Sequence, residues 1–380
     1  MTAQAAPVTP AVLAWAVAED GRPLVDIAER LKVTEDVLDE WLAGESQPTR
    51  GQVTKLAEVL KRPRALFFLP RPPEQATLPA TFRHPPGDDE RDVGAQARRR
   101  VRQARRVQHA VSWALRNEQP VEVPLAMTSD SPEASASRAR EWLGVTIDEQ
   151  RAWRDEYEAL RAWREALDER GVLVFALEIG RDDVRGFSAW DDHAPLIVVN
   201  TSAVNPAARI FTMAHELGHL VTRQDAACID LPRPFSGATV ERWCEQFGAA
   251  LLMPPNATGR LAHSRSIGDG EADLDDVKAV ATAFRVSHRA AALRLIDLGY
   301  AERSLYADVL RVFRPKPPEK DAGRKIASPP RPTLRIRQYG PRTLRTVLSE
   351  LPPRDALSML RVTVEDARRI ADEVPGVPSL

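Results

Sequence analysis

At residues 210–221 the chain reads Ile210-Phe211-Thr212-Met213-Ala214-His215-Glu216-Leu217-Gly218-His219-Leu220-Val221. On a helix, two histidines four residues apart differ by about 400° of rotation, so both imidazoles project from one face. That geometry suits a single metal ion. Glu216 lies about 100° round from His215, which places it to act as a general base on a water held by the metal. The alternative is a buried helix with two hydrogen-bonded histidines.

The expected third ligand is Glu241, at the start of the next helix that the apolar spacing predicts, residues 241–254. Two neutral imidazoles and one carboxylate leave Zn²⁺ with about one net positive charge and an open position for water, as in thermolysin-type sites. Glu245 lies one turn after Glu241 and is placed to accept the free N–H of a ligand histidine. The alternative is that Glu241 and Glu245 form an ordinary solvated face.

Other histidines and cysteines carry weaker predictions. Cys244 is either a thiolate ligand or a small buried hydrophobe, and its apolar helix face favours the second reading. His193 precedes a predicted strand and either steadies an oxyanion in the cleft or lies on the surface. Cys228 falls between the expected ligands and receives no role. His263 and His288 lie beyond the motif, and their claim on the site is weaker still.

Composition limits the classes of protein to consider. The 380 residues suggest roughly two or three domains, and Lys+Arg 53 against Asp+Glu 54 gives a net charge of −1, so no global field attracts nucleic acid or membrane. No run approaches the ~18 apolar residues of a membrane span, so no membrane partner is expected. Two cysteines and no recognisable leader predict a reducing, cytoplasmic compartment.

The first 73 residues predict short helices at 10–19, 24–31 and from Glu35, with Thr34 as N-cap and Gly44 as the stop of the third. This arrangement resembles the lambda-repressor-like (XRE) helix-turn-helix, whose second helix normally contacts DNA. Here that helix carries four carboxylates, which phosphates would repel. The unit therefore either binds DNA through basic residues elsewhere or docks to another protein or to its own partner domain, and no individual DNA-contacting residue is assigned.

A helix is predicted over residues 95–115, with an arginine-rich segment at 98–106. This segment either binds phosphate or forms a solvated or partner-facing surface. A Ser-rich stretch, 128–137, predicts a loop. A helix over about 153–170 is expected to place Tyr157, Leu160, Trp163 and Leu167 on one face. Strands are expected at 172–177, 186–190 and 195–200, the last as a strand that holds an extended substrate by backbone pairing. Two further helices, the second opening at Ser287, are expected over 273–299.

Two blocks give this chain a resemblance to the ImmA/IrrE family of metallopeptidases: Ala214-His215-Glu216-Leu217-Gly218-His219, and Glu241 to Pro254 with Cys244, Phe247 and Gly248. The resemblance implies that His215, His219 and Glu241 are ligands and Glu216 the base. The family often has Ala at the position of Cys244 and Asn or Asp at that of Glu245. It also implies that the substrate is a transcriptional repressor, and the XRE-like front end is a familiar arrangement of the family.

The expected fold class is α+β, mostly helical: a helix-turn-helix bundle followed by a small gluzincin-type metallopeptidase domain with a short three-stranded sheet. The expected segments are 1–73 (helix-turn-helix), 74–147 (helical linker with the arginine-rich helix), 148–300 (zinc peptidase) and 301–380 (Pro-rich linker and short helices). Two hypotheses follow. The first is a zinc-dependent endopeptidase that cleaves a repressor in a stress, phage or mobile-element response. The second is a non-enzymatic DNA- or protein-binding regulator with a structural or sensory zinc site.

Overall fold

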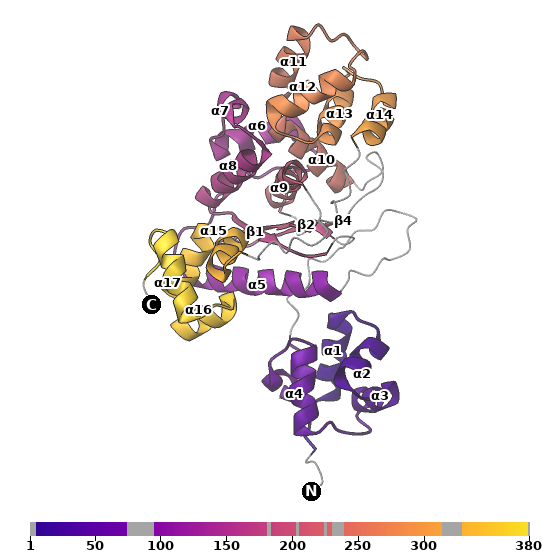
Figure 1. Ribbon diagram of the computed structural model, residues 1–380, viewed down its shortest axis with the longest axis vertical. Helices are drawn as coiled ribbons and strands as arrows, with labels where there is room; N and C mark the ends of the chain where they lie inside the picture. The colour runs from indigo at the N-terminus through magenta and orange to yellow at the C-terminus, as the bar shows by residue number, and fades with distance from the viewer. Residues whose placement is uncertain are drawn as a thin grey trace. The chain divides into compact units, whose positions relative to one another are not determined.

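The computed structural model describes residues 5–73, 95–180, 184–202, 205–223, 226–229, 239–313 and 329–378, with only the backbone described at 95 and 226–229. These residues divide into two compact units, an N-terminal unit up to residue 103 and a C-terminal unit from residue 104 (Figure 1). Each unit has its own apolar core. Among the described residues, no helix is both long and apolar enough to cross a membrane. The proline-rich segments at 74–94 and 314–328 lie outside the described residues.

The N-terminal unit contains α1 (Pro10–Asp20), α2 (Leu24–Leu31), α3 (Glu35–Ala43), α4 (Arg50–Val59) and a short 3-10 helix (Arg64–Phe68). The predicted helices are confirmed, including their ends: the Thr34 hydroxyl accepts the N–H of Val37, and Gly44 ends α3 in the left-handed conformation at φ 79°. Apolar side chains from all these elements meet in one core: Leu13, Ile27, Leu38, Trp41, Leu56 and Phe67.

The arginine-rich helix is α5 (Ala95–Leu115), with the predicted bounds. Its first half belongs to the N-terminal unit, where Arg99 donates to the buried carboxylate of Asp20 at 3.3 Å and Arg102 donates to the carbonyl of Glu19 at 2.6 Å. Both acceptors lie at the C-terminal end of α1, where the helix dipole favours cations. At least these two arginines therefore serve internal contacts. In the C-terminal unit, the buried amide of Gln108 donates to the carbonyls of Ala189 and Ala194.

The C-terminal unit is built on a sheet of β1 (Leu173–Leu177), β2 (Val184–Ala189), β3 (Leu196–Asn200) and β4 (Ala226–Ile229), in the order β1-β3-β2-β4. The α+β, mostly helical class is confirmed, and the three expected strands are joined by a fourth. The expectation that 195–200 holds a substrate by backbone pairing is wrong. β3 is central, parallel to β1 and antiparallel to β2, so both of its edges are already paired. Residues 195–200 come just before the helix that carries His215 and His219 in the chain, but the strand order places them inside the sheet.

Helix α9 (Pro206–Val221) packs on one face of this sheet against β2 and β3, and the second half of α5 lies on the other side of the sheet (Figure 1). α6 (Pro132–Leu143), α8 (Glu156–Glu169) and α10 (Thr239–Leu252) complete the layer around α9. The predicted loop at 128–137 is wrong beyond residue 131, because Ser131 caps α6 and Pro132 opens it. Of the four residues predicted to share one face of α8, Trp163 and Leu167 are buried, whereas Tyr157 is 62% exposed.

The remaining helices surround these elements: α7 (Ile147–Ala152), α11 (Pro255–Ser264), α12 (Leu274–Phe284), α13 (His288–Asp297), α14 (Ser304–Val312), α15 (Arg331–Glu350), α16 (Pro353–Leu360) and α17 (Val364–Glu373). The predicted pair over 273–299 is confirmed, with Ser287 as N-cap of α13. α15 is kinked at Gly340, where φ is 78°. Its Tyr339 ring meets the Phe175 ring of β1 edge-on at 5.1 Å, so the last helices belong to the C-terminal unit.

Candidate metal centre

Helices α9 and α10 carry the candidate ligands, and small residues let the two helices approach closely. A Cβ added at Gly218 would lie 3.1 Å from the Cys244 sulfur, and one at Gly248 would lie 3.2 Å from the backbone nitrogen of His215. Real Cβ contacts are seldom so short. The glycines on both helices therefore permit the crossing that brings Glu241 to the histidines.

Side chains from three other helices hold the far end of α10. Its last carbonyl groups have no partner within the helix, which is the usual state of a helix C-terminus. Buried Arg140 donates to the carbonyl of Leu251 at 2.7 Å, buried Gln150 to that of Leu252 at 3.1 Å, and buried Arg294 to that of Met253 at 2.9 Å. These hydrogen bonds tie α10 to α6, α7 and α13, so the position of Glu241 is fixed along the helix axis.

The structure brings His215, His219 and Glu241 together, with one ligand atom of each within 4.8 Å of the others. The two imidazole Nε2 atoms are 3.2 Å apart, and the Glu241 oxygens lie 3.4 Å from His215 Nε2 and 3.5 Å from His219 Nε2. Metal–donor bonds of about 2.0–2.2 Å at tetrahedral angles place neighbouring donors roughly 3.3–3.6 Å apart. Each imidazole nitrogen therefore has the other nitrogen and one Glu241 oxygen, Oε2 for His215 and Oε1 for His219, at about this spacing, so the group can hold one metal ion, and the N, N, O donor set fits zinc.

The charges at this site favour a cation. Burial opposes the ionisation of Glu241, but hydrogen bonds from His215 and His219 outweigh burial and hold the pKa of this carboxyl well below its usual range. Burial likewise opposes the protonation of His215, yet its hydrogen bond to Glu241 and the nearby carboxylates of Glu216 and Glu245 raise its pKa. The carboxylates around the two imidazoles therefore attract positive charge, which a bound metal ion would supply.

Glu216 lies on the same helix but faces strand β2. Its carboxylate is fully buried, and the Ser188 hydroxyl donates to its Oε2 at 2.8 Å. Ser188 was missed by sequence reasoning, which treated it only as part of a strand. A usable signal was present, because small residues alternate at Gly186 and Ser188 and so face the same side of the sheet.

Two other candidate residues, Glu245 and His193, lie outside this group of three donors. Glu245 is half-buried one turn after Glu241. Burial raises its pKa to about 7, with Glu241 and Asp297 adding to the rise and His215 opposing it. Its hydrogen bond to a ligand histidine stays a prediction. His193 lies in the turn after β2, where its backbone N–H donates to Asp191, and it is not in the three-residue group.

Cys244 is also outside that group and fully buried against Gly218, and burial raises the pKa of its thiol well above the usual value. It therefore packs as a small apolar residue rather than as a thiolate ligand. Cys228 lies in β4, where only the backbone is described. His263 is exposed on α11, and His288 stacks on Phe313 at 3.9 Å.

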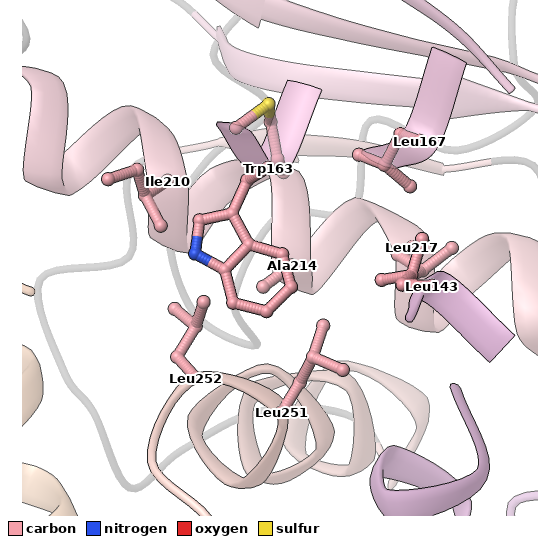
Figure 2. Close-up of a pocket in the computed structure, with 9 residues that line it drawn as sticks. Leu143, Trp163, Leu167, Ile210, Ala214, Leu217, Leu251 and Leu252 are labelled. Carbon is pink, nitrogen blue, oxygen red and sulfur yellow. The ribbon is translucent and has the colours of Figure 1, made fainter. Parts of the chain in front are cut away.

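A small apolar cavity is lined in part by α9, the helix that carries His215 and His219. Ala214 and Leu217 of α9 line it together with Trp163 and Leu251 (Figure 2). Its nine lining side chains are otherwise aliphatic or methionine: Leu143, Leu167, Ile210, Met213 and Leu252. Such a lining offers almost no polar group to orient a substrate, so this cavity is a packing feature of the core.

Residues 167–295 match the model of the peptidase M78 family, described as the IrrE N-terminal-like domain. The match extends from the end of α8 to α13 and contains the whole sheet, both metal-site helices and all three donors. No curated protein matches the chain. The match supports the resemblance to the ImmA/IrrE family, and it supports a metallopeptidase-type function for this part of the chain.

Proposed function

We propose that this protein is a cytoplasmic, zinc-dependent endopeptidase of the gluzincin type. The observation that carries the proposal is the convergence of three side chains: the Nε2 atoms of His215 and His219 lie 3.2 Å apart, and each has one oxygen of the Glu241 carboxylate at 3.4 or 3.5 Å. The peptidase M78 match over the same residues supports it independently of the distances. Glu216 follows directly after the first ligand, which is where a metallopeptidase of this type has its general base.

A zinc ion held by these three residues would lower the pKa of water to about 7 and polarise the scissile carbonyl. Glu216 then takes a proton from the attacking water and passes it to the leaving amine. His215, His219 and Glu241 keep their geometry because α9 and α10 are packed through glycine contacts and α10 is capped at its far end. The substrate peptide is proposed to pair with β4, which is an edge strand in the described sheet.

The proposed substrate is a regulatory protein, and specifically a transcriptional repressor whose cleavage switches genes on in a stress, phage or mobile-element response. The family resemblance motivates this choice of substrate. The helical N-terminal unit, proposed to be XRE-like, would then recruit either the repressor or its operator DNA.

The experiment is a cleavage assay of the zinc-loaded protein on repressors encoded beside its gene, with Glu216→Gln as the test variant. Glu216→Gln is expected to keep bound zinc and to lose about 10²-fold or more of the cleavage rate, because an amide cannot carry the proton. Glu118→Gln, which changes an exposed carboxylate, serves as the matched control. Wild-type cleavage rates in Glu216→Gln would rule out this mechanism.

The second candidate function is a non-enzymatic regulator, which the XRE-like helices motivate. All four acidic residues of α3 are exposed: Glu35, Asp36, Asp39 and Glu40. Such a surface repels phosphate, so this candidate is tested by mobility shift on promoter DNA at several salt concentrations. Tight binding that weakens steeply with salt, in a protein that cleaves nothing, would favour the regulator over the peptidase.

A further inference from the structure

Strand β2 contacts the carboxylate of Glu216 through Ser188. The Ser188 hydroxyl donates to Glu216 Oε2 at 2.8 Å, and both residues are fully buried. A hydrogen bond to an ionised group in a buried setting is short and about twice as strong as a neutral one. Ser188 is not among the expected metal ligands, and the family match gives no role to individual residues.

Gly186, two residues earlier on β2, shows how tightly the strand and the helix fit. A Cβ added there would lie 2.5 Å from the Thr212 methyl carbon, 2.7 Å from the carbonyl oxygen of Val198 and 3.4 Å from Glu216 Oε1. Residues two apart on a strand face the same side, so Gly186 and Ser188 both face α9. The pairing of β2 with β4 shifts register between Val184 and Gly186, and such irregularities are common beside active sites.

We propose that Ser188 is a positioning residue for Glu216, and this inference rests on the function proposed above. Its hydroxyl holds Oε2, so the carboxylate keeps one orientation while Glu216 carries the proton from the attacking water to the leaving amine. Gly186 leaves the room in which the other oxygen, Oε1, lies. A general base that is already held in the reactive orientation does not have to be reoriented in each turnover, so the barrier to proton transfer is lower.

A simpler role for Ser188 is to supply a hydrogen bond to a buried carboxylate, which contributes only to folding. The two roles differ in what they do to turnover. A positioning residue acts on the step in which Glu216 moves a proton, so its loss lowers kcat and leaves KM and the zinc content unchanged. A folding role lowers stability and leaves the kcat of the folded protein intact.

The kinetic experiment compares Ser188→Ala, Ser188→Thr and Ser188→Cys in the full-length, zinc-loaded protein. Ser188→Ala is expected to lower kcat about tenfold to hundredfold, with KM within about twofold and zinc content as in the wild type. Ser188→Thr keeps the hydroxyl and is expected to recover most of the rate. Ser188→Cys, a weak donor of similar size, is expected to fall between Ala and Ser. Ser135→Ala, at a buried serine of α6, is the matched control.

A second measurement tests the contact without any substrate. The destabilisation caused by Ser188→Ala is measured by urea unfolding in the wild type and in Glu216→Met, which has a similar shape but no acceptor. A smaller destabilisation in the Glu216→Met background is expected, because the hydrogen bond is already gone. Equal destabilisation in both backgrounds would show that the two residues are not coupled.

The outcomes separate the two proposals. An active wild type whose kcat survives Ser188→Ala, or falls no more than with Ser135→Ala, overturns the positioning role and leaves the peptidase proposal standing. A wild type that binds zinc and cleaves none of the candidate repressors overturns the proposed function, and the catalytic role of Ser188 with it, whereas the unfolding cycle still reports whether the contact exists.

Discussion

The candidate site depends on positions at which there is no room for a side-chain Cβ atom. Around the candidate site, three glycines lie where a Cβ would meet neighbouring atoms: Gly218 against Cys244, Gly248 against His215, and Gly186 against Thr212. Each is a point at which one secondary-structure element touches another at backbone distance. The site therefore requires these glycines as well as the metal-ligating side chains.

Gly186→Ala tests this packing. The new Cβ would lie 2.7 Å from the Val198 carbonyl oxygen, which belongs to the backbone of the central strand and cannot move aside cheaply. A loss of about 1–3 kcal/mol in the free energy of unfolding is expected, measured by urea titration. Gly259→Ala is the control, because its Cβ would meet only the Tyr300 hydroxyl at 3.1 Å and a helical alanine is otherwise favoured. Equal effects of the two substitutions would contradict the packing argument.

Residue type and spacing are enough to find the histidines and Glu241, because one helical turn fixes which side chains share a face. The same logic cannot find Ser188. Its partner is on another element, and which strand faces α9 depends on a strand order that crosses the chain order. Serine is also too common a residue to stand out without its neighbour.

Among the elements, helices were predictable where polar caps mark their ends, as Thr34 and Ser287 do for α3 and α13. The prediction failed at the start of α6. Its serines and alanines are also common in loops, and only Pro132, the first residue of the helix, marks where the helix begins. β4 is four residues long and carries two alanines, so it has little strand signal of its own. Pairing with β2 makes it a strand.

The capping of α10 gives a prediction at this scale. Arg294→Met removes the donor to the Met253 carbonyl and leaves that buried oxygen without its hydrogen bond. The free energy of unfolding is expected to fall by about 1–3 kcal/mol. Zinc affinity is expected to fall as well, because Glu241 lies at the other end of the helix. Both are measured on the same variant, by urea titration and by competition with a zinc chelator.

Arg311→Met is the control for this variant, since Arg311 forms an exposed ion pair with Asp308 and such pairs contribute little. Its stability is expected to change by no more than about 0.5 kcal/mol. Unchanged zinc affinity in a destabilised Arg294→Met would show that the cap holds the fold but not the metal site.

The N-terminus of α12 gives a prediction of pH dependence. The backbone N–H groups of Asp276 and Asp275 donate to the Asp273 carboxylate and hold its pKa below the usual value, although slight burial opposes them. A carboxyl whose pKa is lowered on folding stabilises the protein above its unfolded pKa of about 3.9, and that stability is lost as pH falls through the folded pKa.

Asp273→Asn keeps a capping oxygen but removes the charge. It is expected to cost about 0.3–1 kcal/mol at pH 7 and less at pH 2, where the Asp273 carboxyl carries less charge, measured by urea unfolding at both values. A cost that is the same at the two pH values would show that the charge contributes nothing.

At the scale of the whole molecule, the chain forms two compact units, and the candidate metal site lies entirely in the C-terminal one. A ligand that binds the folded form of one unit stabilises that unit. Zinc at 100 times its dissociation constant is therefore expected to stabilise the C-terminal unit by about 2.7 kcal/mol and to leave the unfolding transition of the N-terminal unit in place.

Calorimetry with zinc and with a chelator measures this difference. His219→Ala should abolish the zinc-dependent shift, and His263→Ala, at an exposed histidine of α11, should preserve it. A shift that persists in His219→Ala would mean that zinc binds elsewhere.

The last helices, α15 to α17, show that the C-terminal unit extends beyond the family match. The family match stops at residue 295, but the half-buried Arg164 of α8 donates to the carbonyls of Arg337 and Gln338 in α15, and Tyr339 covers Phe175 of β1. A chain cut after residue 313 would leave the guanidinium without those acceptors and uncover an aromatic ring beside the sheet. A truncation boundary drawn from family similarity alone would therefore cut through a compact unit, and the shortest stable version of this peptidase-like unit has to extend into the final helices.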